Sequence, residues 1–556
     1  MKKFILIFFL GLIFNTYSQH CYPPTASIDI DINNIRAKLL NGGDMWWDGV
    51  NSATYQYPKI DTSLGTIPKN VLFAGALWVS GIDNQANLKL AGQTFRNNGH
   101  EFWPGPIVFG TSTIPDTECT KFDRFFPILR TELDAHINAI NAASNPLSIS
   151  SMATNILEWP AKGNQYLLNE YNMEIVDDLA PFQDCNNNEI YDPENGDFPL
   201  MKGDQSIFWV INDIGNVHAR SGGKPLGVEI QCLAYAYISN DEVNDATFYD
   251  YKVIKKTSGN LSDFYFSKFV DPDIGDPTND FIGCDTTLNY GFCYNSDNSF
   301  GVTGEPIAVT QFLKTPGKGL SSFVGFINSS GIAHSDPLNA DGFRLFQEGF
   351  WGDGSPITCG GNGYGGSVPT KFLFHGNPAD TSSGGSACDN WSECSLPNTP
   401  TDKRYIMNSG PYTLNATEAL DFTIAVMIAP TDFNTYNGCP DKTTLINPVV
   451  NLVNDFINTV NDNPYSCKVL SSVIDFNDET DLVSIYPNPT NNILNINTKE
   501  NFEITKLELY DAKGSLIDIK IKDNAIDLTK KAKGIYTLKI YNKNLNKIVL
   551  KKFVLR

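Results

Sequence analysis

Basic residues are scarce in this 556-residue chain. Lys and Arg together number 41 against 62 Asp and Glu, which gives a formal net charge of −21. Nucleic acids and anionic membranes both present negative charge, so proteins that bind them carry a basic surface. The charge balance therefore argues against both classes of partner.

Long apolar runs are lacking after the first residues. Lys2 and Lys3 precede an apolar run from Phe4 to Phe14, and Thr16 and Ser18 are small residues before a cut at Gln19. This order predicts a secretory signal peptide over residues 1–18. The run is shorter than the roughly 20 residues that span a bilayer, and no later run is long enough. We therefore predict a secreted protein with no transmembrane segment.

Catalytic motifs are absent from the sequence. The chain has only 6 His, widely scattered, and no G-x-S-x-G, H-E-x-x-H or G-x-x-x-x-G-K-[ST] pattern. The glycine-rich run 352–366 lacks the Lys-Ser/Thr pair of a phosphate loop, so we interpret it as a turn-rich surface loop. No catalytic residue and no organic cofactor is predicted. A hydrolase with two carboxylates from distant segments remains open.

Zinc-type cysteine pairs are missing as well. All 11 Cys lie between Cys21 and Cys467, and none form a C-x-x-C pair. In an exported chain, disulfides are the expected state, and an odd number leaves at least one thiol free. Spacing along the chain suggests these pairs: Cys284 with Cys293, Cys359 or Cys388 with Cys394, and Cys439 with Cys467.

Turn-forming residues are abundant. The 44 Gly and 31 Pro, with many Asn and Asp, separate short apolar runs, which is typical of a mainly β protein. We predict a β-rich ectodomain over residues 19–474, with a subdivision near residue 200 as an open alternative. Apolar spacing of three and four predicts helices over 131–142 and 445–460. The strands are expected at 71–79, 206–211, 228–238, 247–254 and 420–428.

Composition changes sharply near the C-terminus. Residues 482–556 contain 14 Lys and Arg and 7 Asp and Glu, a net charge of +7 that leaves −28 for residues 1–481. Apolar residues alternate in short runs in this segment, which predicts a small β-sandwich. The polar stretch 475–481 has nothing to bury and is interpreted as an acidic linker.

The same segment carries family motifs. Ser484–Asn492, Leu509–Gly514, Gly534–Ile540 and Lys551–Arg556 resemble the type A C-terminal sorting domain of the Bacteroidota type IX secretion system. The resemblance implies an immunoglobulin-like β-sandwich that the translocon and sorting machinery recognise, and delivery to the cell surface or the extracellular space. The sorting-signal residues it implies are Pro487, Asn488, Pro489, Gly514, Gly534, Tyr536, Lys551 and Lys552.

Two acidic loops are candidate Ca²⁺ sites. Oxygen donors at alternate positions of a tight loop can converge on a cation of this size, and crowded carboxylates repel one another unless a cation neutralises them. The first loop resembles a calcium-type loop of large surface proteins, with Asn188-Glu189 in place of Asp-Gly. The alternative for both is an Asx-rich turn. Candidate ligands are Asp184, Asn186, Asn188, Ile190, Asp192, Glu194 and Asp197 in the first loop, and Asp271, Asp273, Asp276 and Asp280 in the second.

The ectodomain also resembles an uncharacterised family of large surface proteins. That resemblance brings no known activity. The stretches that carry it, besides the two acidic loops, are Asn33–Lys38, Gly42–Gly49, Ala74–Asp83, Trp103–Pro106, Gly203–Gln205, Asp402–Arg404 and Ser409–Pro411.

Two function classes follow from these observations. The first is a non-catalytic adhesion or binding protein, stabilised by Ca²⁺ and disulfides, whose ligand is a glycan or another surface molecule. The second is a secreted hydrolase of polysaccharide or protein. Most of the 8 Trp are expected in the core, but Trp46 and Trp47 are neighbours on a predicted strand, so one of them is a candidate sugar-stacking platform.

Overall fold

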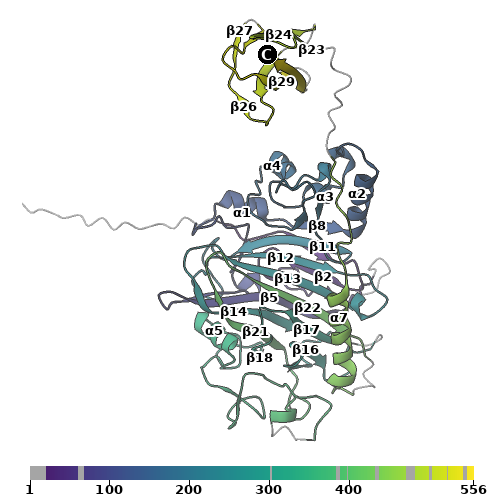
Figure 1. The fold of residues 1–556 in the computed structure, drawn as a ribbon. Coiled ribbons are helices and arrows are strands. Elements are labelled where there is room, and N and C mark those ends of the chain that lie inside the picture. The colour runs from purple at the N-terminus through teal and green to yellow at the C-terminus, as the bar shows by residue number, and fades with distance from the viewer. Residues whose placement is uncertain are drawn as a thin grey trace, which may run out of the picture. The chain divides into compact units, whose positions relative to one another are not determined.

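The chain forms two compact units, Met1–Leu470 and Ser471–Arg556 (Figure 1). The computed structural model describes residues 21–60, 68–300, 304–382, 388–396, 398–431, 437–470, 483–499, 504–522, 524–542 and 548–556. The predicted signal peptide, 1–18, and the predicted linker, 475–481, lie outside these ranges.

Two large antiparallel sheets build the first unit, which confirms the mainly β prediction. Strands on both sides of residue 200 contribute to each sheet. The first sheet runs β1 (Ser27–Ile30), β2 (Arg36–Leu40), β3 (Asp44–Met45), β5 (Asn70–Asp83), β14 (Leu261–Pro272), β21 (Lys403–Leu414), β18 (Ser322–Ile327), with β4 (Tyr55–Gln56) and β6 (Leu88–Gly92) paired alongside. The second runs β15 (Asp280–Asp285), β16 (Tyr290–Asn295), β17 (Ile307–Lys314), β22 (Ala419–Ala429), β13 (Ala246–Lys255), β12 (Val228–Ala236), β11 (Gln205–Asn212), β7 (Trp103–Pro104), with β8 (Phe126–Leu129) beside β11.

The second sheet is buried on both faces. Along β22, Ile424, Val426 and Ile428 belong to the core shared with the first sheet, whereas Ala425 and Met427 belong to a second core on the opposite face. A strand buried on both faces needs apolar residues at every position. This explains why the sequence showed continuous apolar runs there instead of alternation.

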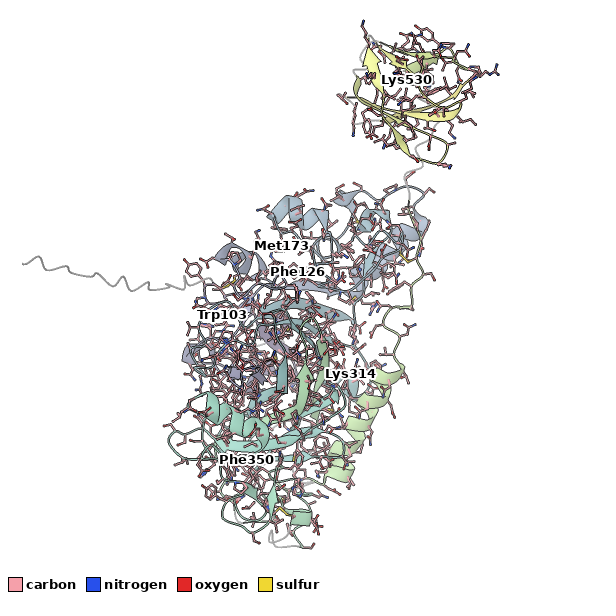
Figure 2. The ribbon with its side chains drawn as sticks, turned by 60° about the vertical axis from the view of Figure 1, so that its left-hand side comes forward. Trp103, Phe126, Met173, Lys314, Phe350 and Lys530 are labelled. Atoms are coloured by element: carbon pink, nitrogen blue, oxygen red, sulfur yellow. A yellow bond between two sulfur atoms is a disulfide. The ribbon has the colours of Figure 1, made fainter. Side chains whose placement is uncertain are left out.

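Helices cover the outer core of the second sheet. Both predicted helices are confirmed as α2 (Arg130–Ala142) and α7 (Asn447–Thr459), and α7 follows a π-helical turn at Lys442–Ile446. Figure 1 shows α1 to α4 gathered near β8 and β11, and Figure 2 labels Trp103 of β7 and Phe126 of β8. The other helical and minor strand elements are α1 (Asp116–Phe122), α3 (Thr154–Leu157), α4 (Gln165–Tyr171), α5 (Ala340–Glu348), 3-10 turns at Arg96–Asn98, Ile149–Ser151, Pro193–Asn195, Glu242–Asp245 and Cys388–Asn390, and the pairs β9 (Phe182–Gln183) with β10 (Phe198–Pro199) and β19 (Ile357–Thr358) with β20 (Pro369–Thr370).

Tryptophan burial corrects one prediction. All 8 Trp are buried, and Trp46 and Trp47 are 0% and 1% exposed. Trp46 donates a hydrogen bond from Nε1 to Tyr249 Oη at 2.9 Å, which joins the two sheets. Trp47 donates from Nε1 to Asp44 Oδ2 at 3.0 Å. Both indoles are therefore structural and neither is an exposed sugar platform.

Disulfides form, but not between the predicted partners. The bonds join Cys21 with Cys119, Cys185 with Cys467, Cys359 with Cys388, and Cys394 with Cys439. The predicted pairs Cys284 with Cys293, Cys359 or Cys388 with Cys394, and Cys439 with Cys467 are wrong.

The fold explains the clearest of these errors. On β15 and β16, Cys284 pairs with Gly291 and Cys293 with Ile282, so the two thiols are two rungs apart. The expectation of an unpaired thiol is confirmed, because Cys232, Cys284 and Cys293 are free and buried.

The second unit consists of two four-stranded sheets around one small core. One sheet runs β23 (Val483–Tyr486), β24 (Ile493–Thr498), β28 (Ala525–Asp527), β27 (Lys520–Lys522), and the other β26 (Leu516–Ile517), β25 (Ile504–Tyr510), β29 (Gly534–Asn542), β30 (Ile548–Leu555). The β-rich prediction for this segment is confirmed.

A lysine lies inside the shared core. Lys268 of β14 is 0% exposed, and its Nζ lies 4.3 Å from the Trp46 ring centroid and 3.1 Å from Met45 Sδ. Burial lowers the pKa of Lys268 from 10.5 to about 7. Between these pH values the unfolded chain binds a proton that the folded chain has released, so this group makes stability rise with pH.

We expect Lys268→Met to raise the melting temperature, most strongly below about pH 7, with the gain shrinking as the pH approaches 10. One pKa unit corresponds to about 1.4 kcal/mol, so the gain amounts to a few kcal/mol. Thermal melts of the parent and of the Lys268→Met variant, recorded from about pH 6 to about pH 10 in steps of about one pH unit, measure this gain. Lys252→Met, at an exposed position of β13, is the matched control. A gain in stability that does not change with pH would contradict the lowered pKa of Lys268.

Candidate metal centre

Three carboxylates converge where three segments of the first unit meet. Asp271 lies near the end of β14, Asp273 begins the loop that crosses to β15, and Asp402 directly precedes β21. One oxygen from each lies within 4.8 Å of the other two. Oxygens on opposite sides of one Ca²⁺ are separated by about twice the 2.3–2.6 Å bond length. The three side chains are therefore spaced to share one cation.

Several carboxylates around this point each have one oxygen without a hydrogen-bond partner among the described residues. Within the described part of the chain, Asp271 Oδ1, Asp402 Oδ1 and Asp280 Oδ2 have no hydrogen bond and no contact with solvent. Asp271 and Asp280 are 2% and 0% exposed as whole residues. A buried carboxylate oxygen without a partner is costly. A cation shared by Asp271, Asp273 and Asp402 would give the unpaired oxygens of Asp271 and Asp402 a partner.

Electrostatics at the cluster oppose ionisation of the carboxylates by themselves. Burial, together with the charges of Asp271, Asp280 and Asp402, raises the pKa of Asp273 to about 9. Burial raises the pKa of Asp271 to about 7, although Arg404 favours its ionised form. Burial also raises the pKa of Asp280 well above its usual value. A bound divalent cation would reverse these shifts by favouring the charged forms.

Arg404 partly neutralises the negative charge of the carboxylate cluster. Its Nε lies 3.1 Å from Asp271 Oδ2, and its Nη1 lies 2.6 Å from Asp336 Oδ2. Asp402 accepts a hydrogen bond from Asn328 Nδ2 at 2.7 Å through Oδ2, the other oxygen of its carboxylate. Arg220 also acts on Asp336 electrostatically. The carboxylates outnumber the two guanidinium groups, so a cation would be needed to hold all of these acids in their charged form.

The structure separates the predicted ligands of this loop. Asp271 and Asp273 belong to the cluster, and Asp280 is buried beside them. Asp276 is exposed and accepts hydrogen bonds from the backbone and hydroxyl of Thr278, at 2.9 and 2.8 Å. We therefore leave Asp276 out of the centre.

Sequence reasoning missed Asp402 as a candidate ligand. Asp402 lies 129 positions beyond Asp273 in the chain and reaches the cluster only because β21 pairs with β14. The one available signal was the Asp402–Arg404 stretch, which we had noted only as part of a family resemblance.

The first acidic loop uses its oxygens within itself. Asp184 accepts hydrogen bonds from the backbone N–H of Asn188 and Glu189, and Asp192 accepts from the side-chain amides of Asn186 and Asn188. These bonds form an Asx-rich turn, the alternative stated for this loop.

Two further residues of the first loop are placed clearly. Asp197 is buried and accepts from the backbone N–H of Cys185 and Asp192, while burial raises its pKa to about 7. Ile190 is 42% exposed, and Glu194 lies in the 3-10 turn that follows. Calcium binding by this loop stays a prediction.

The predicted sorting residues join the two ends of the second unit. Asn488, between Pro487 and Pro489, donates from Nδ2 to the Lys552 carbonyl at 3.1 Å and accepts from the Val554 N–H at 3.0 Å. Its side chain thus holds the backbone of β30.

Other predicted positions build the turns and core of this unit. Tyr536 stacks on Phe553 with ring centroids 5.7 Å apart, and Gly534 begins β29. Gly514, at φ +83°, closes a turn in which Asp511 accepts from the N–H groups of Lys513 and Ser515. Lys551 and Lys552 lie on β30, paired with Leu538 and Thr537.

Comparison with known proteins identifies the C-terminal segment. Residues 484–556 match the model of a family described as a secretion system C-terminal sorting domain. The chain is thus a type IX secretion cargo, delivered to the cell surface or the extracellular space. Helices long and apolar enough to cross a membrane are not found in the ranges that the structure covers.

The comparisons give little information about the ectodomain. A search of curated proteins finds no match. A solved structure of a polysaccharide lyase is similar at 8% identity, covering 59% of this chain and 34% of that one, with a TM-score of 0.17. A likeness at this level carries no argument about fold or activity.

We expect Asn488→Ala to weaken the sorting domain. The substitution removes two hydrogen bonds to β30, each worth about 0.5–1.5 kcal/mol. In the producing bacterium, the secreted fraction of the protein should fall and a cell-associated fraction should accumulate, as measured by immunoblot. Exposed Asn491 is the matched control, because Asn491→Ala leaves the contacts of β30 intact. Equal secretion of both variants would contradict a role for this clamp.

Proposed function

We propose that this secreted protein is a non-catalytic binding protein of the cell surface, stabilised by a calcium ion held by Asp271, Asp273 and Asp402. The observation that carries the proposal is the convergence of three carboxylates within 4.8 Å of one another, two of which present a buried oxygen that has no hydrogen-bond partner among the described residues. A cation of charge +2 is the simplest partner for three converging acidic groups.

Ligand chemistry favours calcium over other metals. The donors are carboxylate oxygens alone, which suit a hard cation. Zinc and copper favour His and Cys ligands, and the cluster of three contains neither. Magnesium keeps several waters and strict octahedral geometry, which fits poorly with a centre where Asp271 Oδ1 and Asp402 Oδ1 have no contact with solvent.

The cation would fix the loop that joins the two sheets. Asp271 lies on β14 and Asp402 directly precedes its neighbour β21, whereas Asp273 and Asp280 lie on the path into the second sheet. A single ion would therefore hold strand ends and the crossing loop together. This is a structural role, and it requires no exchange of ligand or substrate at the metal.

The cavities do not by themselves decide between binding and hydrolysis. A polysaccharide hydrolase of the common kind uses two carboxylates flanking the bond that is cut. The cavity beside β18 is lined by one carboxylate, Glu393, which is paired with Lys403. The cavity near Trp47 is also lined by one, Asp336, which is paired with Arg404. Neither of these two arrangements supplies a free acid and a free base.

A third cavity, next to Lys202, is lined by two carboxylates, Asp250 and Asp421, of which Asp250 is paired with Lys202 at 2.6 Å. We therefore rest the choice of a binding protein on the carboxylate cluster and not on the cavities.

We expect calcium to stabilise the full chain. Thermal melts in Ca²⁺ and in chelator should differ, because ligand at about 100 times its dissociation constant adds about 2.7 kcal/mol. Asp402→Asn should lose most of this difference and one bound ion in native mass spectrometry. Asp276→Asn, from the same loop but outside the centre, should retain both. Identical melts with and without calcium, or an equal loss in both variants, would refute the metal site.

We expect retention without turnover on a carbohydrate ligand. The purified full chain, in Ca²⁺, is incubated with a panel of polysaccharides and with casein, and both retention and product release are scored. Retention on at least one polysaccharide with no released oligosaccharide or peptide supports a binding protein. Product release that disappears on heating the sample would establish an enzyme in its place.

A further inference from the structure

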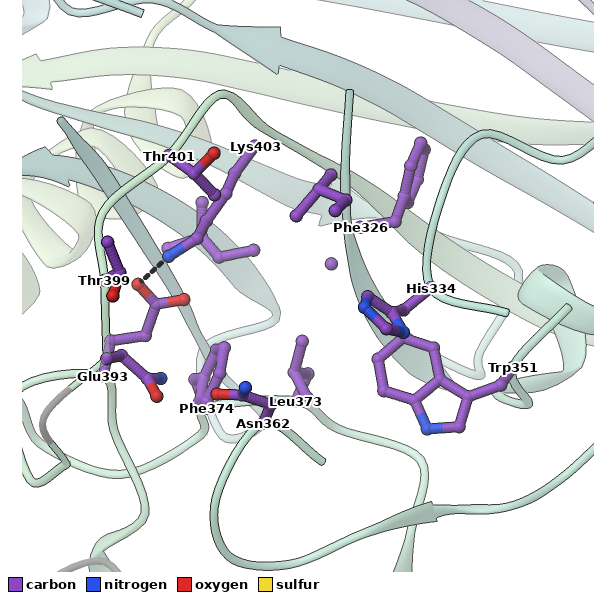
Figure 3. A pocket seen from close by; sticks show the side chains of 14 residues that line it. Phe326, His334, Trp351, Asn362, Leu373, Phe374, Glu393, Thr399, Thr401 and Lys403 are labelled. Atoms are coloured by element: carbon purple, nitrogen blue, oxygen red, sulfur yellow. Dashed lines mark hydrogen bonds and ion pairs between the residues drawn. The ribbon is translucent and has the colours of Figure 1, made fainter. Parts of the chain in front are cut away.

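Two cavities lie against the start of β21, and they differ in what a ligand could reach. Beside β18, Lys403 and Glu393 form a buried ion pair (Figure 3), and Leu373 on the wall is 3% exposed. The cavity near Trp47, which Arg404 lines, has a volume of about 630 Å³ and a rim of exposed side chains. The cavity near Trp47 is therefore the better candidate for a binding site.

The rim of this cavity carries uncharged hydrogen-bonding groups. Three loops of the first unit supply them, after β3, at the 3-10 turn Arg96–Asn98 and after β18. Such amides and hydroxyls donate and accept hydrogen bonds, as the hydroxyl groups of a sugar do. The volume lies within the range of small-molecule sites. The exposed rim side chains are Asn51, Asn97, Asn98, Asn328, Ser329 and Ser330.

Arg220 brings to the cavity a positive charge without an ion pair. Within the described part of the chain, its two terminal nitrogens have no hydrogen-bond partner, and neither nitrogen is shut off from solvent. The carboxylate of Asp336 acts on Arg220 electrostatically, but Asp336 Oδ2 lies 2.6 Å from Arg404 Nη1. Burial lowers the pKa of Arg220. An anion facing the guanidinium would stabilise its charged form.

Buried groups hold Arg220 in place before any ligand arrives. Glu101, which is 0% exposed, accepts hydrogen bonds from the backbone N–H groups of Arg220 and Ser221 at 2.7 and 2.9 Å. Arg220 Nε donates to Thr94 Oγ1 at 3.0 Å, and its guanidinium carbon lies 5.0 Å from the Phe343 ring centroid. The two terminal nitrogens are left as a fixed pair of donors. Such a pair matches the two oxygens of a carboxylate, and fixing it in advance lowers the entropic cost of binding.

The charge of the lining limits how acidic the ligand can be. Arg220 and Arg404 outnumber Asp336, so the lining has a net charge of +1, whereas residues 1–481 carry −28. A chain of closely spaced anionic groups would be repelled by the surrounding surface. A single anionic group inside the cavity would meet local positive charge.

The same cavity wall contacts the metal centre. Arg404 Nε lies 3.1 Å from Asp271 Oδ2, and Asn328 Nδ2 donates to Asp402 Oδ2 at 2.7 Å. A calcium ion at the centre would cancel negative charge directly behind the wall. An anionic ligand should therefore bind more tightly with calcium present.

We propose that the cavity near Trp47 binds an isolated hexuronate unit, a sugar with one carboxylate, of a surface polysaccharide. This inference rests on the proposed binding function and assigns its ligand class. The carboxylate would accept two hydrogen bonds from Arg220. The ring hydroxyls would exchange hydrogen bonds with rim groups such as Asn98 and Ser330, and the C–H face would pack on Phe73, which is partly exposed on the cavity wall.

Methyl glucuronoside and methyl glucoside test the proposal as a matched pair, because they differ only in the carboxylate. Their binding to the full chain, in Ca²⁺ and in chelator, is measured by saturation-transfer NMR and by competition. Glucose 6-sulfate and N-acetylalanine are the sulfate and peptide-type probes. We expect the glucuronoside to bind about tenfold more tightly than the glucoside, because a hydrogen bond between charged groups is stronger than one between neutral groups.

Variants of the arginine locate the site. Arg220→Gln should weaken glucuronoside binding about tenfold and abolish the preference over the glucoside. Arg220→Lys, which keeps the charge without the paired donors, should fall in between. Asn98→Ala, at an exposed rim position, should weaken both glycosides equally. Lys224→Gln is the matched control, because it removes one positive charge from an exposed position of the same segment, outside the cavity lining.

The outcomes separate this site from the wider function. Preference for the glucuronoside that Arg220→Gln abolishes and Lys224→Gln retains supports the site, and thermal melts show whether each variant is folded. If Arg220→Gln does not fold, Arg220→Lys and Asn98→Ala decide. No glucuronoside binding, equal binding of the glucoside, preference for glucose 6-sulfate or N-acetylalanine, or unchanged binding by the arginine variants overturns the site. Polysaccharide retention that survives in Arg220→Gln overturns it too but leaves the binding function intact, whereas absence of the calcium shift in the parent refutes the proposed function itself.

Discussion

Mutual repulsion among buried carboxylates is the constraint on which the centre of this molecule depends. Asp271, Asp273, Asp280 and Asp402 meet at the point where the chain leaves the first sheet for the second. Arg404 offsets only part of their charge. The fold can bring these groups together only if something compensates them, either protons on the acids or a cation between them.

Three consecutive residues at the start of β21 connect the acidic cluster to the cavity beside β18. Successive residues of a strand face opposite ways, and Asp402, Lys403 and Arg404 follow that rule. Asp402 and Arg404 face the acidic cluster, and Lys403 faces Glu393 in the cavity. Because one backbone segment carries all three side chains, anything that fixes the cluster also fixes the cavity wall.

The sequence predicted the features of the fold that local patterns of residues control. Apolar runs and turn residues predicted the strands, and spacing of three and four predicted α2 and α7, because these depend on neighbours along the chain. Partners that the fold brings together from a distance were missed. Asp402 reaches Asp273 only through strand pairing, and the disulfide between Cys185 and Cys467 spans 282 residues. Trp46 and Trp47 appeared as candidates for exposure because alternation along a strand cannot show that both faces are covered.

The Cys185–Cys467 bond has a mechanical consequence for the first unit when the chain is under tension. A pull on the chain beyond Leu470 enters the first unit at Cys467 and passes through the disulfide to Cys185. The intervening segment, which includes the acidic cluster and the cavity, lies inside a closed covalent loop. Tension applied beyond Leu470 therefore cannot unfold α7 first and then the strands one after another. The load bypasses the segment that holds the acidic cluster and the cavity beside β18, and that segment can keep its shape while the chain is under tension.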